Sequence, residues 1–191
     1  MTLPFFPPNL PRVARLRVED FMLLNENGAF SEYAKSELID GEIICMNAQY
    51  SRHGRAKSIF SQRLAAAAAA ANLPYEIWTE TAVHLSADSM PEPDIILTDF
   101  RGQGPIPLES AALIVEVSDT TVDYDLGRKA RIYAQAGVRE YWVLDVENAR
   151  LVVHHAPEGS AYTSKTEFPL GIMAQSITIE GLIASTTDLV D

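Results

Sequence analysis

Apolar positions after residue 50 follow two different periods, and the switch between them marks the predicted elements. Helical spacing begins at Ser51, taken as the N-cap, and ends before Asn72 and Pro74. Near-continuous runs rich in Val, Ile and Leu come next, and such runs are typical of strands that are covered on both faces. A second helix is predicted between the last two runs, with Asp123 as its N-cap and Gly137 at its end. The three runs are DIILT (94–98), ALIVEV (112–117) and YWVLDV (141–146).

The two ends of the chain add shorter elements to this core. Residues 18–27 have the apolar spacing of a helix, and Asp40-Gly41 is a typical hairpin dipeptide between two short strands. The tail is expected to add strands at RLVVHH (150–155), AYTSKTEF (161–168) and QSITIE (175–180). We therefore expect an α/β (α+β) fold, in which helices flank a mixed sheet and additional strands lie at both ends. Four prolines in residues 1–14 indicate an N-terminal arm, and residues 15–191 are expected to form a single domain.

Composition limits the location and the partners of the protein. No apolar run approaches the roughly 18–20 residues that a bilayer crossing needs, so no membrane partner is expected. Cys45 is the single cysteine, which rules out an internal disulfide and favours a reducing, cytoplasmic setting. The formal net charge is −11, whereas a protein that binds nucleic acid through bulk charge is usually basic. Binding to DNA would therefore need a local basic patch, a bridging metal ion or a partner subunit.

Two acids interrupt the apolar runs and are the first candidates for chemistry. Asp94 and Glu116 lie 22 residues apart on successive predicted strands. An ionised carboxylate in an apolar strand is costly unless it is paired, hydrogen-bonded or bound to a cation. The two side chains can converge at one edge of the sheet, where two carboxylates and several waters suit Mg²⁺, or Mn²⁺ in its place. The backbone carbonyl of Val117 would add a ligand, and such an ion would activate water against a phosphate.

Basic residues on the two helices are the second group of candidates. Asp125, Lys129 and Tyr133 are spaced i, i+4 and i+8 along one helix face, and Lys129 would position water or stabilise charge on a phosphate. On spacing alone, the alternative is an ordinary surface lysine paired with Asp125. His53 would donate to a substrate phosphate or serve only in capping and packing, and Arg52 beside it is a candidate contact to DNA. The other basic residues placed to touch DNA are Arg55, Lys57, Arg63, Arg128 and Arg131.

Four stretches of the chain together resemble a known bacterial family. They are SELIDGEII (36–44), SRH at the start of the first long helix (51–53), PEPDIIL (91–97) and LIVEVSDTTVDYDLGRKARIYAQAGVREYWVLDV (113–146). The resemblance is to the Uma-type family of restriction endonucleases, within the PD-(D/E)xK nuclease superfamily, and it covers about residues 15–180. It implies a restriction-endonuclease-like core.

The resemblance also implies roles for particular residues. Asp94 matches the acid of the superfamily's PD motif and Glu116 its second acid, so both would hold the metal ion. The superfamily's lysine is expected two residues after the second acid, where this chain has Ser118, and the family's lysine in the next helix matches Lys129 instead. Glu42 matches another acid of the family and would face the ion through a water molecule.

Two functions from different classes follow from these candidates. The first is a Mg²⁺-dependent DNA endonuclease that uses Asp94, Glu116 and Lys129, and a homodimer is expected because two symmetric sites would cut both strands. The second is a catalytically inactive module of the same fold for binding or assembly. The absence of a lysine two residues after Glu116, the acidic composition and the proline-rich arm favour this second function. Hydrolysis of a phosphate outside nucleic acid would use the same site.

Overall fold

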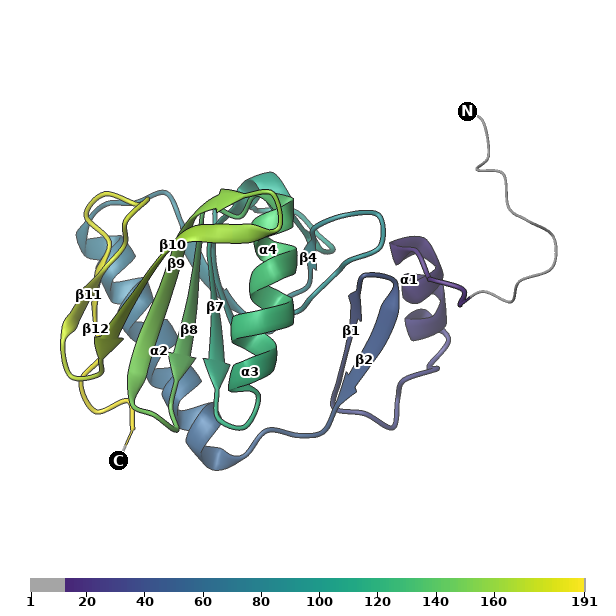
Figure 1. The fold of residues 1–191 in the computed structure, drawn as a ribbon, viewed down its shortest axis with the longest axis horizontal. Helices are drawn as coiled ribbons and strands as arrows, with labels where there is room; N and C mark the ends of the chain where they lie inside the picture. Colours follow the sequence, from purple (N-terminus) through teal and green to yellow (C-terminus); the bar gives the residue numbers. More distant parts are fainter. Residues whose placement is uncertain (1–12, 191) are drawn as a thin grey trace.

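In the computed structural model, which describes residues 13–190, a six-stranded sheet runs through the centre of the molecule (Figure 1). In the order in which they lie side by side, its strands are β10 (Ala161–Pro169), β9 (Arg150–Glu158), β8 (Glu140–Asp145), β7 (Ala111–Ser118), β5 (Ile95–Thr98) and β3 (Glu76–Thr79). Neighbouring strands pair antiparallel except β7 and β8, which are parallel and are joined by a helical segment. The predicted mixed sheet is thus confirmed.

Helices cover both faces of this sheet (Figure 1). α2 (Ser51–Ala70) packs on one face, where Phe60 is fully buried in the core. The other face is covered by one continuous segment, which consists of α3 (Val122–Tyr124), a π-helical turn η2 (Asp125–Lys129) and α4 (Ala130–Ala136). β5, β7 and β8 are buried along their whole length, which explains why their sequences read as apolar runs.

The two helices predicted after residue 50 both form, but their predicted N-caps are wrong. α2 begins at Ser51 itself, so Tyr50 holds the N-cap position and no side chain caps the helix. The second segment begins directly after Thr121, so Asp123 lies inside its first turn. The N-cap thus lies one residue before the predicted one in α2 and two residues before it in the second segment, and the polar side chain of the predicted cap falls inside the helix. The predicted end is confirmed, because Gly137 has a φ of 84° at the C-cap.

A helix and a hairpin lie to the right of α4 in Figure 1. They are α1 (Val18–Glu26), β1 (Lys35–Ile39) and β2 (Glu42–Met46). Asp40 and Gly41 have positive φ angles of 52° and 74°, as the predicted two-residue turn requires. Backbone hydrogen bonds from β1 to the loop before β5 tie the hairpin to the main body. This tie matters for the site, because it fixes the side chains of β1 next to the sheet.

Short elements complete the described chain. β4 (Val83–His84) pairs in parallel with β6 (Ile106–Pro107), and η1 (Leu108–Ser110) is a 3₁₀ turn that leads into β7. The arm predicted over residues 1–14 lies outside the described residues, apart from its last two. None of the helices in residues 13–190 combines the length and the apolar character that crossing a membrane requires.

The C-terminal tail differs from its prediction. RLVVHH and AYTSKTEF lie in β9 and β10 as expected, whereas QSITIE forms no strand beyond its first residue. Instead, β11 (Met173–Gln175) pairs with β12 (Ile183–Ser185). The buried carboxylate of Glu140 accepts hydrogen bonds from the backbone N–H groups of Ile177 and Thr178. In a strand, these two N–H groups would donate to a neighbouring strand. Here the Glu140 carboxylate accepts their hydrogen bonds instead, and the predicted strand does not form.

The burial of His154 in β9 predicts how the stability of the fold depends on pH. Its ring lies against Tyr141 and Tyr162, and its Nδ1 is buried without a hydrogen-bond partner in the described part of the chain. Burial lowers the pKa of His154 to about 4, and the charge of Lys165 acts in the same direction. An unfolded histidine titrates near about 6.5, so the unfolded chain binds more protons and stability falls as the pH drops from about 6.5 to about 4. His154→Phe is expected to keep the stacking and to remove this part of the acid destabilisation.

Thermal unfolding between about pH 7 and pH 4 measures this effect. We expect the Tm of His154→Phe to fall less steeply with pH than that of the wild type. The same substitution at the exposed His84 should leave the wild-type slope unchanged. Parallel curves for His154→Phe and the wild type would show that His154 does not titrate in this window.

Candidate active site

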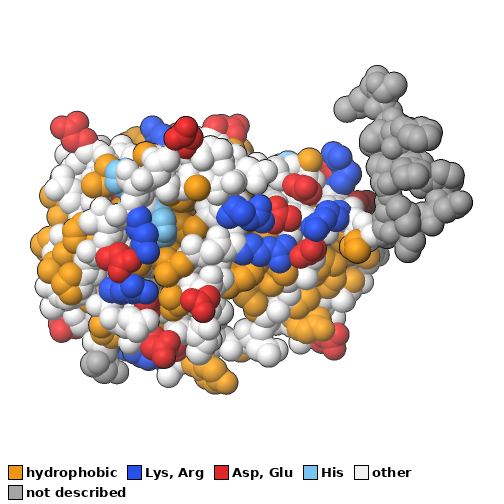
Figure 2. Space-filling model, in the orientation of Figure 1, with side chains coloured by type: hydrophobic (Ala, Val, Ile, Leu, Met, Phe, Trp, Pro, Cys, Tyr) orange, Lys and Arg blue, Asp and Glu red, His pale blue; other side chains and the backbone are white. Residues whose placement is uncertain are grey.

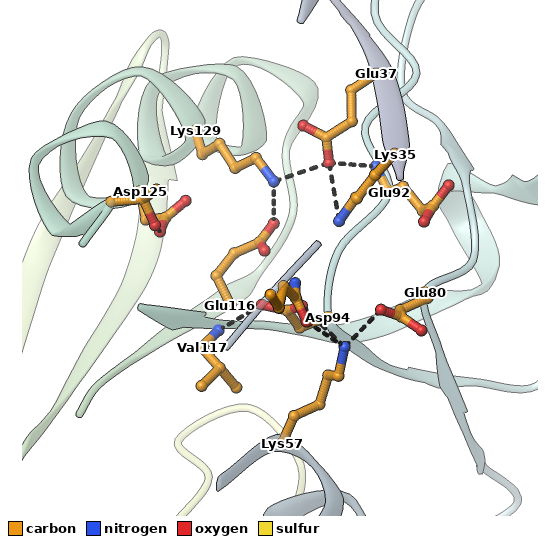
Figure 3. A network of polar contacts seen from close by, with 12 residues as sticks. Lys35, Glu37, Lys57, Glu80, Glu92, Asp94, Glu116, Val117, Asp125 and Lys129 are labelled. Atoms are coloured by element: carbon orange, nitrogen blue, oxygen red, sulfur yellow. Dashed lines mark hydrogen bonds and ion pairs between the residues drawn. The ribbon is translucent and has the colours of Figure 1, made fainter. Parts of the chain in front are cut away.

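A cavity of about 530 Å³ opens where β5 begins and β7 ends, between the sheet, the hairpin and the first turn of α2. Asp94, Glu116, Val117 and Lys129 all line it (Figure 3), so the structure brings together the residues that the sequence selected for chemistry. Further lining residues come from the hairpin, from the loops that follow β2 and β7, and from the first turns of the helices that come after these loops. They include Lys35, Gln49, Tyr50, His53, Asp119, Tyr124 and Asp125.

The register of β5 and β7 explains why the two acids meet. Ile95 pairs with Val115, so continuing the ladder by one residue places Asp94 opposite Glu116. The Val117 N–H donates a hydrogen bond of 2.9 Å to Asp94 Oδ2. The N–H and C=O of one strand residue point to the same side, so the Val117 carbonyl also faces Asp94. Oxygen atoms of all three predicted ligands therefore gather at this edge of the sheet.

Contacts from α2 and the loop before it keep Asp94 ionised. Its Oδ2 lies 3.1 Å from His53 Nε2, and its Oδ1 accepts a hydrogen bond of 3.1 Å from Gln49 and lies 3.7 Å from Lys57 Nζ. Burial would raise the pKa of Asp94, but the hydrogen bond and charge of His53, together with the charge of Lys35, hold it well below its ordinary range. His53 is thus directed at Asp94, and it orients this carboxylate.

Glu116 is enclosed on the face of the sheet that α4 covers. Only 2% of it is exposed, and its Oε1 accepts hydrogen bonds from Lys129 Nζ at 2.8 Å and from the Tyr133 hydroxyl at 2.9 Å. Burial raises the pKa of Glu116 to about 8, although the charge of Lys129 opposes this shift. Such a carboxyl group needs more positive charge nearby to ionise fully at neutral pH. A bound cation would provide it.

The π-helical turn η2 carries Lys129 into this cluster. Single π turns interrupt α-helices frequently at functional sites, and here the turn lies between α3 and α4. The side chain of Lys129 is buried, and its Nζ donates hydrogen bonds to Glu116 and to Glu37 at 2.8 and 2.9 Å. Lys129 is therefore not the exposed lysine that spacing alone left as the alternative.

Glu37 on β1 belongs to the cluster, although the sequence analysis did not select it. It is fully buried, and its Oε1 accepts hydrogen bonds from Lys129 Nζ and from the backbone N–H of Glu92, both at 2.9 Å. Lys35 lies two residues earlier on β1 and places its Nζ 3.4 Å from the same oxygen (Figure 3). A signal was present in the sequence, because Glu37 is an acid beside apolar strand residues, like the two acids that were selected.

This buried cluster has more negative than positive charge. Its four carboxylates, each at most 4% exposed, belong to Glu37, Asp94, Glu116 and Asp125. Only two buried ammonium groups face them, those of Lys35 and Lys129. Lys57 is also near, but it is paired with Glu80 at 2.6 Å, so this pair adds no net charge. With all four carboxyl groups ionised and His53 neutral, four carboxylates against two lysines leave an excess of two negative charges, which one divalent cation would balance. Without a cation, the raised pKa of Glu116 reduces this excess by keeping its proton bound.

The donor set fits Mg²⁺ in kind and in number. No group of three or more His, Cys, Asp or Glu side chains in residues 13–190 is arranged to hold a metal by itself. Mg²⁺ does not need such a group, because it typically takes one or two protein carboxylates and keeps several waters. Asp94, Glu116 and the Val117 carbonyl provide hard oxygen atoms beside a cavity with room for those waters.

Glu42 lies outside the cavity. Its partly exposed carboxylate pairs with Arg15 and Arg128 at 3.2 and 2.7 Å. The structure does not bring it to the cluster, because strand pairing sets it opposite Ile39 beside the hairpin turn. Glu37 takes the place that was expected for Glu42 near the other two acids.

The basic residues considered as DNA contacts are bonded within the chain. Arg52 reaches only the rim of the cavity, where it donates to Asp119 at 3.2 Å and to the Val146 carbonyl. Arg128 and Arg131 pair with acids of the hairpin turn. Figure 2 shows acidic and basic side chains interleaved over the region of α4 and the hairpin, so this face is a mixed patch and not a basic one. The others bond to oxygen atoms of the chain as well: Arg55, Lys57 and Arg63.

Comparison with known proteins shows the family of the chain and a related fold. The model of the Uma2 family, described as "Putative restriction endonuclease", matches residues 18–186. No curated protein matches the chain. Among solved structures, the chain is similar to a "putative nuclease belonging to DUF820" from Anabaena variabilis, with a TM-score of 0.66 at 17% sequence identity. The match covers 91% of this chain and 97% of that one, and it confirms the predicted nuclease-like fold.

Proposed function

Because the chain belongs to the Uma2 family, we propose that it is a Mg²⁺-dependent endonuclease that hydrolyses phosphodiester bonds of DNA in this cavity. Asp94 and Glu116 would hold the ion together with the Val117 carbonyl. The observation that carries the proposal is the buried cluster, in which four carboxylates face only two lysines. A divalent ion would balance this excess and would also let a phosphate approach a protein of net charge −11.

Hydrolysis of a phosphodiester needs a water nucleophile, a broken bond to one ester oxygen, and donors for the charge on the phosphate. When bound, a divalent ion supplies a water of lowered pKa and offsets negative charge on the phosphate. Burial would lower the pKa of Lys129, but Glu116 and Glu37 hold it well above its ordinary value. Lys129 therefore acts as a charged hydrogen-bond donor to the water or the phosphate, and not as a base. The Tyr133 hydroxyl orients Glu116.

The position of Lys129 suggests how this chain does without a lysine two residues after its second acid. Ser118 holds that position, and its hydroxyl donates to Asp125 in the π-helical turn. The lysine approaches Glu116 from the helix instead of from the strand. In both arrangements an ammonium group would lie next to the metal-binding acid.

Incubation of supercoiled plasmid with the wild type and Mg²⁺ or Mn²⁺ tests the proposal. We expect cleavage that EDTA abolishes, and a loss of roughly 10²-fold or more in Asp94→Asn, because a neutral amide is a weaker ligand for a hard cation. The same change at the exposed Asp99 is the matched control and should leave the rate unchanged. Equal rates for Asp94→Asn and the wild type would contradict the site.

A binding or assembly module of the same fold is the second candidate function. The observation that favours it is that Lys129 already bonds to two acids of the cluster, while the candidate DNA-binding arginines are bonded within the chain. Calorimetric titration with Mg²⁺ and Mn²⁺ separates the two functions. Binding that Asp94→Asn weakens supports the endonuclease, and an absence of binding supports the module.

A further inference from the structure

The cavity contains hydrogen-bond donors that the chemistry described above does not use. Lys35 from β1 and Tyr124 from α3 line it together with Lys129. Both lie near the same acid: Lys35 contacts Glu37, and the charge of Glu37 acts on the Tyr124 hydroxyl. Two elements that are far apart in the sequence thus direct donors into one cavity.

Lys35 is a buried ammonium group with unused hydrogen-bonding capacity. Its side chain is 9% exposed, and its only ion pair within residues 13–190 is the 3.4 Å contact with Glu37. An ammonium group has three N–H donors, so most of them remain for a ligand. Glu37 alone does not explain this lysine, because Glu37 Oε2 is buried and has no partner in the described chain. A lysine that served only to neutralise Glu37 would be expected to bond to that oxygen.

Tyr124 presents a hydroxyl without a partner. The oxygen is buried and makes no hydrogen bond within residues 13–190, although the side chain lines the cavity. Burial raises the pKa of Tyr124 to about 12, and the charge of Glu37 adds to this shift. The hydroxyl therefore keeps its proton at neutral pH and acts as a donor. A buried donor without a partner is rare in native proteins and calls for an acceptor.

Lys129 differs from these two residues, because its ammonium group is already engaged. It donates to Glu37 and to Glu116, and both bonds are short. Because an ammonium group has three N–H donors, Lys129 has at most one left to bind an additional anion. An anion in the cavity would thus find most of its free donors on Lys35 and Tyr124.

We propose that Lys35 and Tyr124 form a phosphate subsite, in which the Lys35 ammonium and the Tyr124 hydroxyl donate hydrogen bonds to non-bridging oxygens of the substrate phosphate. The inference rests on the proposed function of the same cavity and identifies the group of the substrate that these residues recognise. The subsite is conditional on a divalent ion, because four carboxylates against two lysines repel an anion until that excess is balanced. The subsite contacts the phosphate and not a base, so it does not contribute to sequence specificity.

Binding of thymidine 3′,5′-bisphosphate, a small probe with two phosphates, tests the subsite without requiring cleavage. We expect calorimetry to detect binding to the full chain with Mg²⁺ and none with EDTA. Lys35→Gln and Tyr124→Phe should each bind the probe about tenfold more weakly or worse, since each loses a hydrogen bond to a charged group. Their affinity for Mg²⁺ alone should be unchanged, or higher in Lys35→Gln, which loses a competing positive charge. Lys35→Arg keeps the charge and should bind the probe within a few-fold of the wild type.

The controls are Lys165→Gln and Tyr33→Phe, which make the same changes at exposed side chains that do not line the cavity. Wild-type affinity for the probe in Lys35→Gln and Tyr124→Phe would overturn the subsite, as would a wild type that ignores the probe in the presence of Mg²⁺. Loss of probe and Mg²⁺ binding together in Tyr124→Phe would also overturn it and indicate a structural role. The plasmid assay tests the proposed function separately. A protein that binds the probe but cleaves no DNA would support the phosphate subsite and contradict the endonuclease activity.

Discussion

Replacing Glu116 with glutamine is expected to abolish divalent-ion binding and to lower DNA cleavage by at least about 10³-fold without destabilising the fold. Glutamine has the same shape, and its Oε1 can still accept the hydrogen bonds from Lys129 and Tyr133. The buried carboxylate has a cost in the metal-free protein, because burial raises the pKa of Glu116 to about 8. A carboxyl group whose pKa is raised on folding lowers stability at neutral pH, so a neutral glutamine removes this cost. Lys129 still keeps Glu37 as its ion-pair partner. A Tm equal to or above that of the wild type should therefore accompany the loss of activity.

Plasmid cleavage, Mn²⁺ calorimetry and thermal unfolding without metal measure these effects on the same preparation. Glu109→Gln makes the identical change at an exposed acid just before β7 and should match the wild type in all three. If Glu116→Gln loses activity only because it unfolds, its Tm will be far below that of the control. If it keeps its affinity for Mn²⁺, Glu116 is not a metal ligand.

The sequence was sufficient to select the two strand acids for a simple physical reason, whereas Lys129 was selected through the family resemblance. Asp94 and Glu116 lie in runs that are otherwise apolar, so their charges need a partner in any fold that buries those runs. The mixed sheet followed from the same runs, which are buried along their whole length. Their meeting depends only on an antiparallel ladder between neighbouring strands, and β5 and β7 form that ladder.

The rest of the site depends on tertiary contacts that local patterns do not contain. Lys35 and Glu37 reach the cluster because the hairpin is tied by backbone hydrogen bonds to the loop before β5. Glu42 is on the same hairpin, but its pairing with Ile39 leaves it beside the turn, next to the arginines. The alternation of β1 places Lys35 and Glu37 on one face, which the sequence does show. Nothing in the sequence indicates that this face of β1 is turned towards the helical segment that carries Lys129.

The largest effect on stability is expected from Lys129→Met, which removes the cation that two buried acids share. Glu116 can take up a proton, since burial already raises its pKa to about 8. Glu37 does so less easily, because Lys35 remains beside it and opposes the rise in pKa that burial causes, as it does together with Lys129 in the wild type. Breaking a buried ion pair from one side costs about 3–5 kcal/mol. For a chain of this size that corresponds to a Tm lower by roughly 6–20 °C.

A double-mutant cycle with Glu37→Gln shows whether this cost comes from the charge of Glu37 or from lost packing. If it comes from the charge, Lys129→Met/Glu37→Gln should recover most of the Tm that Lys129→Met loses, because the acid that lacked a partner is now neutral. DNA cleavage should not recover, since Lys129 has a chemical role that neutralising Glu37 cannot replace. Lys165→Met, at an exposed lysine, is the control for the loss of a lysine as such. A double variant that recovers both stability and cleavage would reduce Lys129 to a counter-ion, and another donor, such as Lys35, would then have to serve the phosphate.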